Sequence, residues 1–378
     1  MKLEISELEN FRQKSDTTAD TLIKNLHEEM GSNLIWKLYN NLINDLEEIN
    51  IQNLPKTLNA FFIENQKIPS WADYNLIAIS ERLFLEIGPL YSACLLCRAL
   101  PIGYSSLKTV KVLTATGYLS KDVKEGTAKR LLETTQFIFN VMEEGTFCAN
   151  SKGIKHILKV RFLHAMIRYH LLKHNWAVNK YDIPINQEDM AGTILTFSVG
   201  AMKGLEKINV KLSPKEKDAI THYWSVVGYI IGVDEKLLPH NYTEGEKLYE
   251  TILSHQAAYS TDGEELTRAL CNFIRGFLPI KPLNDFPEYL VNYLIDNPKY
   301  SHLIGVKHPE KMDKLIFCLL ISYFKFINKH RKKRLFANLI QKSNNIFAAQ
   351  LITYFSQEFD LKLSIPQKIQ ASWGLKYS

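Results

Sequence analysis

Only five of the 378 residues are cysteines, an odd and sparse set for a chain of this length. Such a set argues against a disulfide framework and for a reducing compartment. Cys94 and Cys97 form a Cys-x-x-Cys pattern, but they lie inside the apolar run Leu90–Leu100, and no second cysteine pair completes a zinc site. We therefore interpret them as two buried cysteines of a helix.

Motifs of several enzyme classes are also missing. The sequence has no P-loop, no Gly-x-Gly-x-x-Gly after a strand and no Gly-x-Ser-x-Gly elbow, so nucleotide binding and serine-hydrolase chemistry lack their usual supports. The charged N-terminal segment lacks the apolar region of a signal peptide. The longest apolar stretch, Leu315–Phe324, is shorter than the roughly 20 residues that a transmembrane helix needs. We therefore expect a cytoplasmic protein.

The net charge of +6 is modest, and the basic residues are mostly interleaved with acidic ones, so we expect no nucleic-acid partner. The exception is the basic cluster Lys329–Arg334, which ends the largely apolar segment Leu315–Arg334. This segment has two interpretations. It is either a peripheral contact with an anionic membrane surface or a core helix whose positive end complements the helix dipole. We favour the core helix.

Apolar residues recur with the period of an α-helix along most of the sequence, while strand-like alternation is nearly absent. Eighteen tyrosines and nineteen phenylalanines suit a core, and also a pocket for a bulky apolar ligand. No repeat or long linker divides the chain, so we predict an all-α protein with a single large helical domain and peripheral C-terminal helices. After a helical pattern from Leu22 to Ile51, the predicted helices are Asn75–Ile87, Pro89–Ala99, Ser105–Thr116, Thr127–Met142, His156–His174, Gln187–Leu205, Pro214–Ile231, Gly245–His255, Gly263–Arg275, Phe286–Ile295, Glu310–Arg334 and Phe336–Phe355.

The predicted helix His156–His174 carries the first candidate site. Arg161, His164 and Arg168 are spaced i, i+3 and i+7, so they share one side of a helix that is otherwise apolar. Buried charges need partners. One solution is a haem, with the imidazole on iron and the guanidinium groups on its polar edge. The other is an arginine–carboxylate network with a hydrogen-bonded core histidine, and spacing alone favours this second solution.

Two further helices carry weaker signals. In Thr127–Met142, Arg130 and Thr134 lie one turn apart with Glu133 beside them, so they either line a polar pocket wall or bond each other. The segment Asn186–Leu205 is rich in small residues, which allow a helix or a flat ligand to approach its backbone closely.

The order and spacing of these segments resemble the family of bacterial rubber oxygenases (latex-clearing proteins) and the fungal oxygenase that shortens the farnesyl chain in mycophenolic acid biosynthesis. The likeness runs from about Ala19 to Pro239. The segments that carry it are Ile68–Asp73, Leu113–Gly117, Arg130 with Thr134, Val160–Ala165 with Arg168, Trp176, Ile183–Ser198 and His222–Pro239.

The resemblance implies a helical fold that encloses a haem b pocket and cleaves an isoprenoid-like C=C bond with O2. By position, His164 is similar to the proximal iron ligand, and Arg161 and Arg168 are its companions on the helix. Arg130, Thr134 and Thr196 match residues that would line or support the pocket. The implied haem domain spans residues 19–335, between an N-terminal extension (1–18) and a C-terminal helix and tail (336–378).

One departure concerns the residue before the pocket threonine, which is a lysine in the rubber oxygenases and Glu133 here. A carboxylate poorly replaces a neutral ligand of iron such as the lysine amine, but it can orient a water molecule or accept a proton. We therefore expect an open or water-ligated distal side. The predicted function is a haem oxygenase that acts with O2 on an apolar small molecule, either an isoprenoid, an unsaturated lipid or a phenolic compound. The alternatives are a non-catalytic haem- or lipid-binding protein and a helical scaffold that has lost the cofactor.

Overall fold

The computed structural model describes residues 4–31, 34, 35, 38, 54–115, 123–149, 151–277, 285–306, 311–330, 333–359 and 367–373. All regular elements of these residues are helices, and one isolated bridge joins Ser106 to Ala257. The all-α prediction is therefore confirmed. The helices are α1 (Ile5–Arg12), α2 (Thr17–Met30), α4 (Lys56–Asn65), α5 (Tyr74–Cys94), η2 (Leu95–Ala99), α6 (Leu100–Gly103), α7 (Leu107–Ala115), α8 (Val123–Val141), α9 (Lys152–Lys173), α10 (Val178–Tyr181), α11 (Gln187–Leu195), η3 (Thr196–Gly200), α12 (Ala201–Lys207), α13 (Pro214–Ile230), η4 (Glu235–Leu237), α14 (Tyr242–Gln256), α15 (Thr261–Phe277), α16 (Phe286–Ile295), α17 (Pro298–Leu303), α18 (Lys311–Lys329), α19 (Arg334–Phe359) and α20 (Gln367–Trp373).

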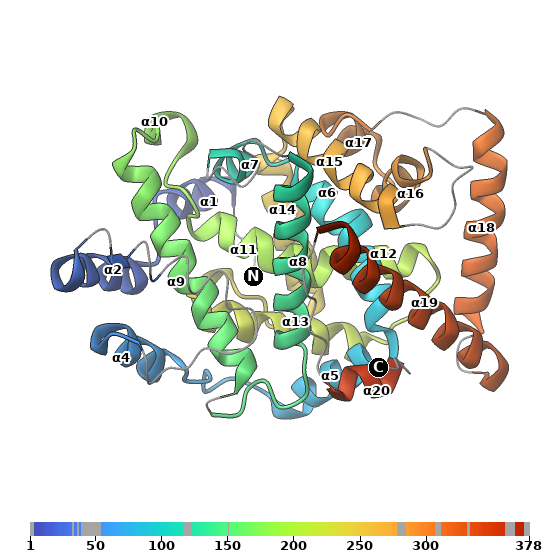
Figure 1. Ribbon diagram of the computed structural model, residues 1–378, viewed down its shortest axis with the longest axis horizontal. Helices are drawn as coiled ribbons and strands as arrows, with labels where there is room; N and C mark the ends of the chain where they lie inside the picture. The colour runs from blue at the N-terminus through green and yellow to red at the C-terminus, as the bar shows by residue number, and fades with distance from the viewer. Residues whose placement is uncertain are drawn as a thin grey trace.

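The helices run in several directions rather than side by side in a simple bundle (Figure 1). The helix α13 packs along α5, while α8 packs against α9 and α15, and α11 packs against α13 and α14. In the view of Figure 1, α2 and α4 stand at one edge and α18 at the other. One hydrophobic core joins most of these elements. It includes Leu8 and Phe11 near the N-terminus and Phe355 and Trp373 near the C-terminus, so the segments outside residues 19–335 pack into the same core.

Local capping explains where several predicted helices begin. The Ser213 hydroxyl accepts a hydrogen bond from the Glu216 amide in a capping box, with Pro214 at the first helical position of α13. Asn186 caps α11 in the same way, by accepting from the amide of Asp189. These short-range signals are in the sequence itself, which is why both predicted starts agree with the structure.

Pro89 does not separate two helices, so the predicted break between Ile87 and Pro89 is wrong. The residues Tyr74–Gly103 form one continuous helical stretch of 30 residues through Pro89. Proline lacks an amide hydrogen, so the carbonyl of Leu85 loses its helical partner. In the fold, Ser372 Oγ (2.8 Å) and Trp373 Nε1 (3.1 Å) of α20 donate to that carbonyl instead. A tertiary contact thus replaces the missing local hydrogen bond.

By length and composition, Tyr74–Gly103 is the one helical stretch of the described residues that is apolar enough to cross a membrane. The predicted break at Pro89 divided this stretch into two shorter helices. In the fold, 61% of its most apolar window is buried inside the protein. The apolar composition of this stretch is therefore explained by its packing as a core helix.

Two π-helical segments, η2 and η3, pack against each other. Arg98 of η2 donates from Nη1 to the carbonyl of Gly200 in η3 (2.8 Å). Close by, a Cβ on Gly204 would lie 2.8 Å from the Cβ of Cys94, a distance that real side chains do not adopt. The small residues of this segment therefore serve close helix packing. Cys94 and Cys97 are both buried free thiols, as predicted.

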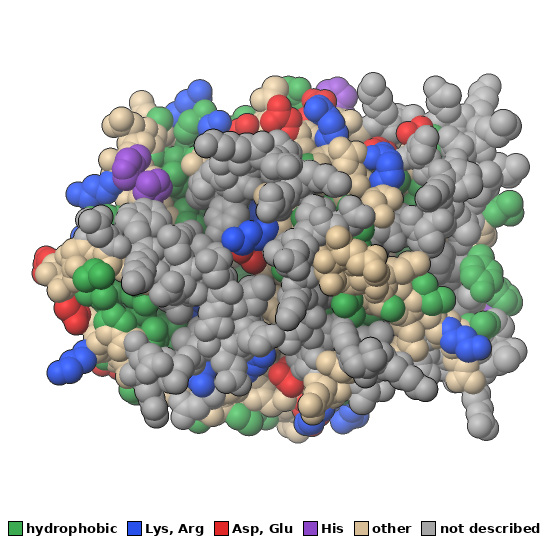
Figure 2. Space-filling model, viewed as in Figure 1, with side chains coloured by type: hydrophobic (Ala, Val, Ile, Leu, Met, Phe, Trp, Pro, Cys, Tyr) green, Lys and Arg blue, Asp and Glu red, His purple; other side chains and the backbone are tan. Residues whose placement is uncertain are grey.

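The helix α18 presents an apolar side to the protein and another to the outside. Phe317 and Ile321 are buried, whereas Leu319, Tyr323 and Phe326 are 64%, 53% and 54% exposed. Figure 2 shows hydrophobic side chains along the edge where Figure 1 places α18. The interpretation as a core helix therefore holds for one side of α18, and the predicted membrane contact stays a prediction for the other.

Candidate functional site

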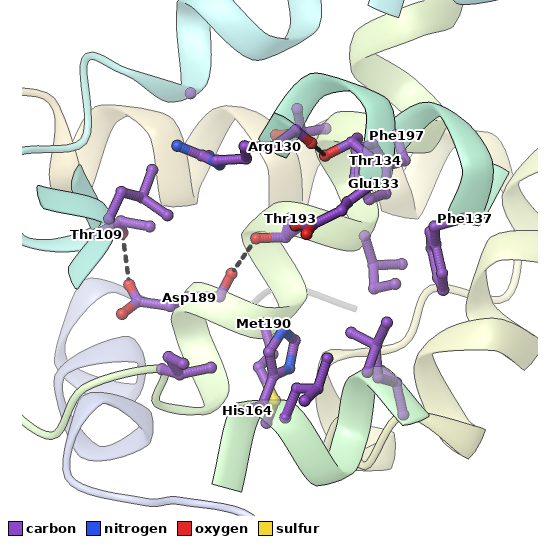
Figure 3. A pocket seen from close by; sticks show the side chains of 18 of the residues that line it. Thr109, Arg130, Glu133, Thr134, Phe137, His164, Asp189, Met190, Thr193 and Phe197 are labelled. Atoms are coloured by element: carbon purple, nitrogen blue, oxygen red, sulfur yellow. Dashed lines mark hydrogen bonds between the residues drawn. The ribbon is translucent and has the colours of Figure 1, made fainter. Parts of the chain in front are cut away.

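A cavity of about 380 Å³ lies between α7, α8, α9, α11 and η3 (Figure 3). This volume falls in the range of small-molecule and cofactor sites, roughly 300–1,000 Å³. Its walls are mainly apolar and include Leu113, Phe137, Leu163, Ile194 and Phe197. The cavity therefore suits a bulky apolar guest with a small number of polar contacts.

His164 of α9 lines this cavity, and Figure 3 shows its ring pointing inward. Its Nδ1 is buried and has no hydrogen-bond partner among the described residues. Burial lowers the pKa of His164 to about 4, and the nearby charge of Arg168 adds to this effect. The imidazole is therefore neutral at pH 7 and carries a lone pair on one ring nitrogen, as a metal ligand requires.

Arg161 and Arg168 do not line the cavity. Arg161 holds Asp16 through two hydrogen bonds, Nε to Oδ2 (2.6 Å) and Nη2 to Oδ1 (2.9 Å). Arg168 donates from Nε to Asp20 Oδ1 (2.7 Å). Their contacts are therefore those of the arginine–carboxylate network rather than those of a pocket wall.

Helix geometry explains why the three residues separate. Each residue turns an α-helix by about 100°, so Arg161 and Arg168 lie on one flank of His164. Leu163 and Ile167, which line the cavity, lie on the other flank. The spacing correctly placed the three residues on one side of the helix. It did not show that His164 lies between the arginine–carboxylate network on one flank and the cavity on the other.

The Asp16–Arg161 ion pair is enclosed by a glycine turn. Gly232 has a φ of +95°, and a Cβ there would lie 2.4 Å from Asp16 Oδ2 and 2.8 Å from Arg161 Nε. Arg161 Nη1 also donates to the carbonyl of Ile230 (3.1 Å). This pair therefore fixes α9, and with it His164, against the start of α2 and the end of α13.

The helix α8 supplies the facing polar residues Arg130, Glu133 and Thr134, as predicted for a pocket wall. Thr134 Oγ1 also donates to the carbonyl of Arg130 (2.9 Å), so both interpretations of this pair apply. Thr196, the first residue of η3, lines the cavity as well. The structure thus brings together His164, Arg130, Glu133, Thr134 and Thr196, which come from three segments.

Glu133 is half-buried in the cavity wall, and its buried Oε1 has no hydrogen-bond partner among the residues that the structure describes. Burial raises the pKa of Glu133 to about 7, although the charges of Lys129, Lys159 and Arg130 act against this rise. A carboxyl that titrates near neutral pH can both give and take a proton.

We expect a pH-dependent stability that depends on Glu133. Its pKa is about 7 in the folded protein against a model-peptide value of 4.5, so the folded state binds more protons between these values. Stability therefore falls as pH rises through this window, by up to about 3 kcal/mol. Relative to Glu133→Gln, the wild type should lose stability between pH 5 and pH 8 in urea unfolding. Exposed Glu86→Gln is the control, and a difference for Glu133→Gln that does not vary with pH would contradict this assignment.

Several polar residues of the wall, among them His156 and Lys159, were not predicted from the sequence. Burial lowers the pKa of His156 to about 3, and its Nε2 lies 3.1 Å from Asn140 Nδ2. With Leu163 and Ile167 they lie on one side of α9, so helical periodicity could have found them once the cavity side was known. Among the described residues no group of three His, Cys, Asp or Glu side chains is arranged to hold a metal ion.

Comparisons with known proteins identify a family and a fold for this chain. Residues 94–316 match the family described as "ER-bound oxygenase mpaB/B'/Rubber oxygenase, catalytic domain". The rubber oxygenase of Streptomyces sp. (strain K30) is 24% identical over 232 residues, which make up 58% of this chain and 54% of that protein. The match thus spans about half the length of that relative. A solved structure of latex clearing protein LCP in the closed state shares the fold, with a TM-score of 0.69, 18% identity and 90% of each chain covered.

Proposed function

We propose, since the chain belongs to the mpaB and rubber oxygenase catalytic-domain family, that it binds haem b and oxidises or cleaves an apolar unsaturated small molecule with O2. Rubber oxygenases are haem enzymes. The observation that supports a haem in this chain is His164, a neutral imidazole with a buried, unpartnered ring nitrogen in the wall of an apolar cavity.

The residues of the cavity fit this cofactor. His164 would hold the haem iron, since a histidine is a common protein ligand of haem iron. The apolar walls suit the porphyrin and exclude water. Arg161 and Arg168 would support the haem site indirectly, because their ion pairs with Asp16 and Asp20 hold the helix that carries His164.

When bound, haem would supply iron chemistry for oxidation with O2. The chain provides a dry cavity, in which the apolar side chains position the alkene and keep water from the reacting centre. Glu133 holds or accepts a proton at its carboxyl, since its pKa is close to 7. Thr134 and Thr196 add hydroxyl groups to the same wall.

A non-catalytic haem- or lipid-binding protein is the second candidate. The observation in its favour is Glu133, which stands where the rubber oxygenases have a lysine. A carboxyl with a pKa near 7 gives the distal side no nitrogen ligand for iron. Such a protein would use the same cavity and His164 but would not catalyse the oxidation.

Haemin titration of the purified protein, followed by its absorption spectrum, tests the cofactor. We expect stoichiometric uptake with a Soret band and no nitrogenous sixth ligand in the resting state. Oxygen uptake with an isoprenoid alkene then separates an oxygenase from a binding protein. A protein that takes up no haemin would refute the oxygenase and the haem-binding protein and leave only lipid binding. Haemin uptake without oxygen consumption or altered alkene would leave the haem-binding protein.

A further inference from the structure

The cavity wall holds a cation, Arg130, in mainly apolar surroundings. Both wall histidines are neutral at pH 7, and Glu133 is only partly ionised there. Asp189 also lines the cavity, but it is paired with Arg12, which two further carboxylates share. Arg130 therefore brings positive charge into apolar surroundings, which favours a guest with a negative group.

Arg130 is the cation best placed to receive that group. Its half-buried side chain lines the cavity, and Figure 3 shows it reaching from α8 toward the side where Thr109 lies. Its guanidinium has no hydrogen-bond or ion-pair partner in the described part of the chain. By contrast, Arg12, Arg98 and Arg161 all donate to carboxylates or carbonyls. A guanidinium offers a planar fork of donors that matches a carboxylate.

The other side chains of the cavity indicate the chemistry of the rest of the bound molecule. Leu113, Leu163, Ile167 and Ile194 line it with branched apolar side chains. A guest that satisfies both parts has an apolar body and a single anionic end. We propose that the substrate of this site is an apolar unsaturated acid whose carboxylate is held by Arg130. This inference rests on the proposed function, because it names the substrate class of the same cavity.

Haem b also carries carboxylates, so the experiment must separate two sources of the same chemistry. The probes are citronellate, an isoprenoid acid with one C=C bond, and citronellol, its neutral alcohol. Binding of each is measured by calorimetry to the haemin-loaded protein and, separately, to the protein without haemin. The variants are Arg130→Gln, Arg130→Lys and, as a matched control outside the cavity, the exposed Arg268→Gln.

Wild type should bind citronellate more tightly than citronellol. Arg130→Gln should weaken citronellate by about 10- to 100-fold, the effect of losing a charge-assisted hydrogen bond, and change citronellol by less than about 3-fold. Arg130→Lys should restore part of the loss, and Arg268→Gln should change neither probe. The unchanged affinity for citronellol also shows that the variant is folded.

Two results would overturn the proposal. Equal affinities for acid and alcohol in wild type would show that the cavity does not select an anion. Weaker haemin uptake by Arg130→Gln, with the preference for citronellate unchanged, would assign Arg130 to the haem carboxylates instead. If the protein takes up no haemin but still binds citronellate through Arg130, the proposed function fails while the anion site stands.

Discussion

Replacing His164 by alanine is expected to abolish stoichiometric haemin uptake by this protein. His164 lines the cavity with a neutral imidazole, whose buried Nδ1 has no hydrogen-bond partner among the described residues. Loss of an outer hydrogen-bonding partner of a metal ligand costs about 10- to 100-fold in affinity, and loss of the ligand itself should cost more. The measurement is the Soret absorption during haemin titration, together with oxygen uptake, which should fall to background.

His156→Ala is the matched control for this variant. His156 lines the same cavity on the same helix, but its ring lies within hydrogen-bond distance of Asn140. We expect its haemin spectrum to keep a histidine-ligated Soret band. Added imidazole should restore a similar band to His164→Gly, because it can enter the space that the side chain leaves. Wild-type uptake by His164→Ala would refute the assignment of the ligand.

Replacing Asp16 by alanine is expected to lower the free energy of unfolding by about 3–5 kcal/mol, the usual cost of breaking a buried ion pair on one side. The side chains of Asp16 and Arg161 are only 4% and 10% exposed. Without Asp16, Arg161 keeps only the neutral acceptors Asn65 and Ile230. Asp16 also caps α2 by accepting from the Ala19 amide, which adds to the loss. Urea unfolding measures the change.

Glu144→Ala provides the comparison, since it removes an ion pair with Lys368 in which both side chains are more than half exposed. Its expected cost is at most about 1 kcal/mol. The double variant Asp16→Ala/Arg161→Met should recover part of the loss of the single variant, because it removes the charge that Asp16→Ala leaves buried. Equal losses in free energy of unfolding for Asp16→Ala and Glu144→Ala would show that the Asp16–Arg161 pair does not stabilise the fold as a buried ion pair.

The sequence by itself determined the features that depend on neighbours along the chain. Caps such as Ser213 and Asn186 predicted where helices begin, because the side chain and the amide that it accepts from are three residues apart. Helical spacing also placed Arg130, Glu133 and Thr134 on one side of α8, where they line the cavity. The order and spacing of several segments, among them Val160–Ala165 with Arg168, also identified the family correctly.

Only the tertiary structure decided which partners these residues have. Arg161 meets Asp16 across 145 residues of sequence, so spacing alone could not choose between a haem edge and a carboxylate. Pro89 stays inside a helix because α20 supplies donors to the carbonyl of Leu85. The pKa of Glu133 near 7 likewise comes from burial by surrounding helices. Periodicity fixes the side of a helix on which a residue lies, but what faces that side is set by the packing of distant segments.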